Sequence, residues 1–284
     1  MIKDDLVSII MPTFNSAQHV EESIKSILAQ TYTNWELIIT DDNSTDDTRL
    51  ILQRYASEHK RIKYFFLYKN SGAGYCRNNS IKHATGRYIA FCDSDDSWTP
   101  DKLERQLDLM EQKKCCLCYS AYYTCDEEDG SINGIVKVPE KLTLKDMKHD
   151  NKIGCLTGIY DSTWFGKFYM PTFRKRQDWG MFLKIMIKCE VAYGINEPLA
   201  YYRVNENSIS SNKKSLVKYN AEVYKSIFGY SDLKAYCYLY FIFIPSYLTK
   251  KFKNWIASRK LMRKLARKNG LSLKDTSKLP FLKS

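Results

Sequence analysis

The sequence lacks several features that define familiar classes of protein. The strongly apolar run at residues 236–248 has 13 residues, too few for a membrane-spanning helix, which needs roughly 20. The N-terminus shows no basic region followed by an apolar segment, as a secretory signal would. No internal repeat is evident. We therefore expect neither a membrane-spanning protein nor a repeat protein.

Paired zinc ligands are also missing. The nine cysteines are an odd number without regular spacing, which favours free thiols and a reducing cytosol. Three of them cluster at residues 115–118, but no second Cys or His pair stands at zinc-finger spacing. The four histidines are scattered, and we assign them no role.

Positive charge is concentrated at the C-terminal end of the chain. The formal net charge is +12, and from Thr249 onward twelve Lys and Arg residues face Asp275 alone, which leaves the first 248 residues near +1. Such a tail suits nucleic acid or anionic lipid. The aromatic run before it favours an anionic membrane surface, because apolar burial and lipid attraction then act together. We expect no nucleic-acid partner.

Strands and helices alternate in the first half of the chain. Each short apolar run ends in polar residues and is followed by a helical pattern, which predicts a parallel sheet covered on both faces. The loops at the carboxyl ends of such strands meet at one edge of the sheet. The predicted strands are residues 6–11, 35–40, 62–67 and 88–92, and the loops are residues 12–15, 41–42, 72–77 and 93–96.

The second half of the chain has a more mixed pattern. A hydrophobic content of 44% supports a sizeable core, and the chain is helical in character from residue 216. We therefore predict one α/β domain over residues 1–212 and a helical, aromatic and basic region over residues 213–284. The predicted strands of this half are residues 115–124, 131–138, 155–160 and 199–204, and the predicted helices before residue 216 are 101–112, a short one at 143–150, and 180–189.

Three carboxylates follow the fourth predicted strand within four positions: Asp93, Asp95 and Asp96. Like charges this close repel one another, so the cluster is either a solvated turn or a site for a divalent cation. Its position directly after a buried strand favours the cation, and hard oxygen ligands suit magnesium, manganese or calcium. A metal of this kind fits transfer from a nucleoside diphosphate donor, whose leaving diphosphate needs neutralising.

The motifs together resemble the family 2 glycosyltransferases with a GT-A fold, and most of all the bacterial enzymes that build lipopolysaccharide and capsule chains. The resemblance runs from about Leu6 to Ser211. It implies a Rossmann-like mixed sheet flanked by helices, inverting transfer from a nucleotide sugar, commonly a UDP-sugar, and manganese or magnesium as cofactor. The motifs are Pro12–Asn15, Asp41–Asp46, Gly72–Gly74 with Arg77 and Asn78, Asp93–Asp96, and Gln177–Trp179.

The resemblance also assigns roles in binding the donor. It implies that Asp93 faces the ribose and that Asp95 holds the metal. The chemistry of the side chains agrees, since Asp42 can accept from a base N–H and Arg77 offers a planar fork to oxygens. Each of two donor-binding roles has an alternative: the Phe14 ring could simply pack in the core, and Arg77 could form a surface ion pair. The residues implied around the donor nucleotide are Pro12, Thr13, Phe14, Asp42, Arg77, Asp93 and Ser94.

The resemblance implies that Asp178 is the general base that deprotonates the acceptor hydroxyl. The alternative is a helix N-terminal cap, where the dipole would lower the pKa of the carboxyl group. Trp179 either stacks on an acceptor sugar or packs in the core, and Trp164 is expected on the acceptor side. Asp96 either assists the metal or caps the next helix, and we favour the cap. Asn205 stands where relatives often have His, which leaves open how metal use is affected.

The sequence therefore predicts a glycosyltransferase that adds one sugar to a glycan or lipid-linked acceptor. We expect it at the cytoplasmic face of the inner membrane, attached peripherally through its C-terminal region. Two alternatives are another nucleotide-dependent transferase, such as a nucleotidyltransferase, and a non-catalytic nucleotide-binding module at the membrane.

Overall fold

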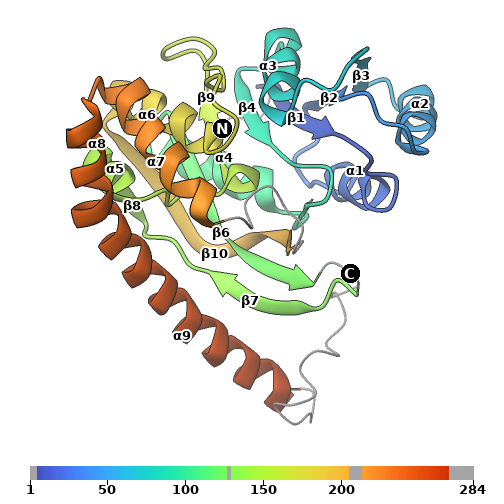
Figure 1. Ribbon diagram of the computed structural model, residues 1–284. Coiled ribbons are helices and arrows are strands. Elements are labelled where there is room, and N and C mark those ends of the chain that lie inside the picture. The colour runs from blue at the N-terminus through green and yellow to red at the C-terminus, as the bar shows by residue number, and fades with distance from the viewer. Residues whose placement is uncertain (1–4, 127–128, 205–212, 269–284) are drawn as a thin grey trace.

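A computed structural model describes residues 5–126, 129–204 and 213–268. The described strands form one ten-stranded mixed sheet flanked by helices (Figure 1). Its main path runs β3-β2-β1-β4-β9-β6-β10-β5, with β7 paired to β6 and β8 paired to β10. The predicted α/β class is confirmed.

The first four strands are parallel, as predicted. In the register of β1 with β2, Thr13 lies opposite Asp41, so the two carboxyl ends are level. Both strands are buried along their whole length, which explains their continuous apolar runs. The elements are β1 (Val7–Thr13), α1 (Val20–Leu28), β2 (Trp35–Asp41), α2 (Thr48–Glu58), β3 (Ile62–Phe66), α3 (Ala73–His83) and β4 (Tyr88–Phe91).

The second half mixes parallel and antiparallel pairs. Residues 155–160, predicted as one strand, form a short 3-10 helix, η1 (Cys155–Thr157), and then β9 (Ile159–Asp161). β9 is antiparallel to β4, and the sequence pattern missed the two-residue strand β5. The remaining elements up to residue 204 are β5 (Ser97–Trp98), α4 (Lys102–Lys113), β6 (Leu117–Asp126), β7 (Ile132–Val136), β8 (Lys141–Thr143), α5 (Leu144–His149), α6 (Gln177–Cys189) and β10 (Val191–Val204).

The C-terminal helices share the core of the sheet domain. Trp179 on α6 packs against Tyr224 and Phe243, with ring centroids 5.6 and 5.2 Å away. The predicted boundary between residues 212 and 213 adjoins residues outside the described part, and it stays a prediction. The elements are α7 (Lys213–Phe228), α8 (Asp232–Tyr238), the π-helical turn η2 (Leu239–Phe243) and α9 (Ile244–Lys268).

Helix α9 leaves the helical cluster and extends along β7 (Figure 1). Side chains of the helix bond to the edge of that strand: Ser258 Oγ accepts from the N–H of Ile135 (3.0 Å), and Asn254 Oδ1 accepts from the N–H of Lys137 (3.3 Å). These bonds cover polar groups of an edge strand that would otherwise be open to pairing. Over the described residues, no helix combines the length and apolarity needed to cross a bilayer.

Candidate active site

A cavity of about 1710 Å³ opens where the carboxyl ends of β1 and β2 face the start of α6. One side, the donor half, is lined by residues between positions 12 and 96. The other side, the acceptor half, is lined by residues between positions 136 and 257, including one face of α9. The cavity is therefore bounded by both the sheet domain and the C-terminal helices.

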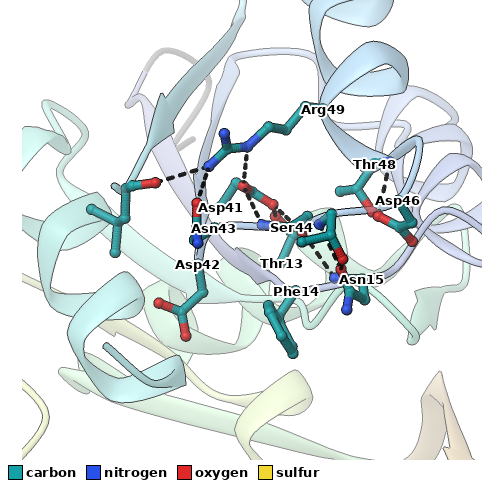
Figure 2. A network of polar contacts seen from close by, with 12 residues as sticks. Thr13, Phe14, Asn15, Asp41, Asp42, Asn43, Ser44, Asp46, Thr48 and Arg49 are labelled. Atoms are coloured by element: carbon teal, nitrogen blue, oxygen red, sulfur yellow. Dashed lines mark hydrogen bonds and ion pairs between the residues drawn. The ribbon is translucent and has the colours of Figure 1, made fainter. Parts of the chain in front are cut away.

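Buried Asp41 ties together the ends of β1 and β2 (Figure 2). Its carboxylate accepts bonds from Arg49 Nε (2.8 Å), the Ser44 N–H (3.0 Å) and Thr13 Oγ1 (3.2 Å). Asn15 supports the same loop, because its Oδ1 accepts from the Thr45 N–H (2.9 Å). Asp41 is thus a structural residue that holds the loops carrying the next side chains.

Asp42 and Phe14 extend away from this network and line the cavity (Figure 2). The Asp42 carboxylate accepts the backbone N–H groups of Ser71 (2.6 Å) and Gly72 (2.8 Å), so it also positions the loop before α3. Gly72 has a φ of 89°, a conformation that favours glycine. The Phe14 side chain is 49% exposed, so packing in the core does not account for it. Its ring is available to an apolar or aromatic part of a ligand.

Arg77 and Asp93 form an ion pair inside the donor half. Arg77 Nη2 donates to both carboxylate oxygens of Asp93, at 2.6 and 2.7 Å. The Asp93 carboxylate raises the pKa of Arg77 well above its usual value against the opposing effect of burial. The Arg77 Nε atom is buried and has no acceptor among the described residues. The pair thus places a fixed cation and a carboxylate side by side in the cavity wall.

The other two carboxylates of the acidic cluster have different surroundings. Asp96 is buried and accepts the backbone N–H of Arg203 (3.1 Å), and burial raises its pKa well above the usual range. It does not cap the next helix, because the N-cap of α4 is Asp101; our expectation of a cap was wrong. Asp95 is open to the cavity, and its enclosed position, followed by the charge of Asp93, raises its pKa to about 6.

The residues present fit a metal that binds together with a diphosphate. Among the described residues, no group of three or more His, Cys, Asp or Glu side chains is arranged to hold a metal ion. Magnesium needs no such group, because it often binds through one or two carboxylates and the phosphates of a substrate. The Asp95 carboxylate accepts no hydrogen bond from another described residue, and carboxylate oxygen suits magnesium and manganese. Asp95 would therefore be the protein ligand.

Asp178 lies across the cavity, in the first turn of α6. The N-cap of this helix is Arg176, with φ 65°, so Asp178 itself is not the cap. Its Oδ2 accepts a hydrogen bond from Asn151 Nδ2 (3.0 Å). A half-buried carboxylate held from one side and facing a cavity is arranged to accept a proton from a ligand hydroxyl.

Two residues of this wall were missed by the sequence analysis. Asn151 orients Asp178, and Lys250 of α9 supports Asn151 by donating to its backbone carbonyl. Lys250 also pairs with Asp150 at 2.6 Å. No motif or spacing links positions 151, 178 and 250, because they are brought together by tertiary packing alone.

The predicted residues do not all reach the cavity. Trp179 is fully buried and donates from Nε1 to the carbonyl of Met147 (2.8 Å), so of its two alternatives it packs in the core and does not stack on an acceptor. Trp164 is 48% exposed and is not among the residues that line the cavity, so its place on the acceptor side stays a prediction. Asn205 lies outside the described residues. Pro12, Thr13 and Ser94 line the donor half, and the Ser94 hydroxyl lies 2.7 Å from that of Ser16.

This fold and cavity define a glycosyltransferase with a GT-A fold. The chain belongs to glycosyl transferase family 2, whose model matches residues 8–171.

Several bacterial relatives share most of their length with the chain. TuaG of Bacillus subtilis, whose provisional name describes a teichuronic acid biosynthesis glycosyltransferase, is 41% identical over 82% of this chain and 93% of its own. WfgD of Escherichia coli is 38% identical over 74% of this chain and 81% of its own. It is named as a β-1,3-glucosyltransferase that moves glucose from UDP-Glc to α-D-GlcNAc-diphosphoundecaprenol.

Solved structures share the fold at low identity. S. aureus TarS 1–349, in complex with UDP-GlcNAc, has a TM-score of 0.68 and 19% identity, covering 86% of this chain and 72% of that chain. The Pyrobaculum calidifontis mannosyltransferase PcManGT, in complex with GDP-Man and Mn2+, has a TM-score of 0.60 and 18% identity, covering 93% and 80%. These two similarities show that the chain shares its fold, a mixed sheet flanked by helices, with solved glycosyltransferase structures.

Proposed function

We propose that this protein is an inverting, metal-dependent glycosyltransferase of bacterial surface polysaccharide synthesis. It moves a sugar from a nucleotide sugar, a UDP-sugar in this proposal, to a glycan or lipid-linked acceptor. The observation that carries the proposal is the placement of Asp95 and Asp178 on opposite halves of one cavity. Family membership favours sugar transfer over nucleotidyl transfer and over a non-catalytic module. The name of TuaG, a teichuronic acid biosynthesis glycosyltransferase, supports a role in polysaccharide synthesis. The name of WfgD, which uses UDP-Glc, supports a UDP-sugar as the donor.

The donor nucleotide would occupy the donor half. The ring of Phe14 would contact the base, and Pro12, Thr13 and Asp42 would surround the same base. Asp93, held by Arg77, would accept from the ribose hydroxyls, with Ser94 next to it. These side chains are fixed by strand ends and their bonded loops, so they bind the donor without large rearrangement.

Asp178 would carry the proton transfer. As the acceptor oxygen forms its bond to the anomeric carbon, the bond from that carbon to the donor diphosphate breaks on the opposite face, which inverts the configuration. Asp178 takes the proton of the acceptor hydroxyl, and Asn151 holds the carboxylate in place. A magnesium or manganese ion on Asp95 would supply Lewis-acid neutralisation of the departing diphosphate.

Replacing Asp178 by Asn tests the assignment of the base. The variant keeps the size and polarity of the side chain but cannot accept the proton, so we expect transfer to fall by about 10²–10⁴-fold. Binding of UDP, measured by calorimetry, should stay within about twofold of wild type, because Asp178 is outside the donor half. A folded variant that transfers sugar at the wild-type rate would contradict the assignment.

Replacing Asp95 by Asn tests the metal ligand separately. An amide oxygen is a weaker ligand than a carboxylate for a hard cation, so manganese should no longer increase UDP affinity. Calorimetric titration of UDP with and without manganese measures this change independently of turnover. Equal enhancement by manganese in wild type and variant would exclude Asp95 as the ligand.

We further propose that residues 213–284 form the unit that attaches the enzyme to the cytoplasmic face of the inner membrane, beside a catalytic domain of residues 1–212. Exposed Leu248, Phe252 and Trp255 recur on one side of α9 at a spacing of four and three residues. Lys and Arg residues flank them along the helix. This combination suits an interfacial helix on anionic lipid.

A further inference from the structure

The two halves of the cavity have opposite charge. The donor half is lined by four aspartates and one arginine, whereas the acceptor half is lined by eight Lys and Arg residues and only two aspartates. The excess of positive charge faces the space where an acceptor, and not the nucleotide, would lie. Four of these cations act on one another: Lys250 is affected by the charges of Arg176 and Lys152, and Lys152 by that of Lys253.

These four cations act on one another electrostatically, and Asp150 and Asp146 offset only part of their charge. Burial lowers the pKa of Lys152, and the charge of Lys253 adds to this effect. Burial likewise lowers the pKa of Lys250, with Arg176 and Lys152 contributing. Among the described residues, only Lys250 of the four forms an ion pair, at 2.6 Å from Asp150. Desolvated like charges are costly, and a bound anion would relieve that cost.

The structure places two of these cations on a helix face that is directed at the cavity. The residues of α9 that line the cavity follow spacings of three and four, so they form one face. The exposed apolar residues at positions 248, 252 and 255 lie on the opposite face at 100° per residue. The cavity face of α9 consists of Ser246, Thr249, Lys250, Lys253, Asn254 and Ala257.

We propose that Lys152, Lys250 and Lys253, together with Arg176, form a subsite for an anionic group of the acceptor, either a phosphate or diphosphate or a carboxylate. This inference rests on the proposed function, since it assumes that the acceptor half receives the acceptor. The group could belong to a lipid phosphate or to an acidic sugar, and both present oxygens that lysine and arginine bind by charge-assisted hydrogen bonds.

The donor diphosphate is a less suitable occupant of this subsite. The nucleotide site is built from the ends of β1, β2 and β4, whereas Lys250 and Lys253 come from α9 in the opposite wall. A diphosphate neutralised by a metal on Asp95 would leave three of the four cations, Lys152, Arg176 and Lys253, without an ion-pair partner among the described residues. The anion that reaches them must therefore enter with the second substrate.

Two probes test the proposal in the full-length protein with its donor site filled by UDP and manganese. Inorganic pyrophosphate and methyl glucuronide are titrated at low ionic strength, where screening is weak. We expect at least one of them to bind, and Lys253→Gln to weaken that binding about tenfold, the loss of one hydrogen bond to a charged group. Binding of pyrophosphate alone would identify a phosphate-bearing acceptor, and binding of the glucuronide alone an acidic sugar.

Lys251→Gln is the matched control, because Lys251 is the same residue type on α9, is exposed and does not line the cavity. It should bind the probes like wild type. Lys152→Gln provides a second subsite variant away from α9 and should weaken binding as Lys253→Gln does. The proposal is overturned if neither probe binds wild type, or if the subsite variants bind like the control. UDP release from a UDP-sugar, assayed in the same preparations, reports separately on the proposed function.

Discussion

At the scale of single residues, surroundings give five aspartates of similar sequence context different roles. Asp41 holds the strand ends and Asp42 holds the loop before α3. Asp93 pairs with Arg77, while Asp96 is buried on a backbone N–H. Of these five, Asp95 alone keeps a carboxylate that is open to the cavity and accepts no hydrogen bond from another described residue. The availability of an oxygen, more than the presence of a carboxylate, decides which of them could bind a metal.

Asn151 should matter for turnover through Asp178. Asn151→Ala removes the hydrogen bond to Asp178 Oδ2, so the carboxylate loses its fixed orientation, and we expect kcat to fall by about 10–100-fold. The KM for the donor should be unchanged, because the donor half is not altered. Steady-state kinetics measure both values.

The exposed hydrogen bond between Asn133 and Thr124 provides a control for this prediction. Asn133→Ala should leave kcat at the wild-type value. A wild-type kcat in Asn151→Ala as well would show that Asp178 does not depend on Asn151. Asn151→Asp adds a negative charge beside Asp178 and should lower kcat at least as strongly as alanine does.

Sequence reasoning located the donor-side residues better than the acceptor-side ones. Thr13 ends a buried parallel strand, Asp42 and Asp95 follow two others, and the geometry of such a sheet brings these positions together. Sequence reasoning left two alternatives for Trp179, and the structure decides between them, because the helical turn directs the tryptophan into the core while its neighbour Asp178 lines the cavity. Lys250 could not be found, since its place depends on how α9 packs.

At the scale of elements, the parallel part of the sheet was predictable, and in the mixed part the longer strands β6 and β7 were predictable but the shortest strands were not. Buried strands in series with helices give long apolar runs, as in β1 and β2. The antiparallel strands β5 and β8 have two and three residues, too few for any periodic signal. Their pairing with β10 is set by tertiary contacts.

Helix α4 carries a buried lysine that should make stability depend on pH. Lys102 is fully buried, with its Nζ 2.7 Å from Gln106 Oε1 and 3.9 Å from the centroid of the Trp98 ring. Burial lowers its pKa from 10.5 to about 7. Between these values the unfolded chain binds a proton that the folded chain does not, so this residue makes the free energy of unfolding rise with pH.

Lys102→Met removes this titration. We expect wild type to gain stability relative to the variant from about pH 7 to pH 10, by up to about 1.4 kcal/mol per pH unit. Urea unfolding of both proteins at several pH values measures the difference. A constant difference across this range would mean that Lys102 stays protonated in the folded protein.

At the scale of the whole molecule, α9 joins the cavity to an exposed apolar surface. Its inner face lines the acceptor half and bonds to β7, while Phe252 and Trp255 are 61% and 52% exposed on the other side. One helix therefore contributes both to the acceptor half of the cavity and to the proposed contact with the membrane. The sequence predicted the composition of this surface, and its contact with the cavity depends on the fold.

The double variant Phe252→Ser with Trp255→Ser should bind anionic vesicles at least about tenfold more weakly than wild type, because burial of each large apolar side chain contributes roughly 1.5–3 kcal/mol. Sedimentation with vesicles of acidic phospholipid measures the bound fraction. UDP binding should be unchanged, since neither residue lines the cavity.

Tyr68 is an exposed aromatic residue away from α9 and provides the control for this prediction. Tyr68→Ser should sediment with the vesicles like wild type. Equal sedimentation of the double variant would exclude this side of α9 as the membrane contact. Higher salt should weaken binding of all three proteins, because the basic residues contribute through a screened attraction.

Because the cavity and the exposed apolar residues lie on opposite faces of α9, the helix also determines the distance between the cavity and the membrane surface. A helix with its side chains is about 10–12 Å across, so an enzyme resting on Phe252 and Trp255 would hold its cavity roughly one helix diameter above the lipid. A hydroxyl group carried at that height can enter directly, whereas the far end of a long glycan would have to fold back toward the membrane. The distance between membrane and cavity, about one helix diameter, would thus favour short acceptors, which occur early in the growth of a glycan.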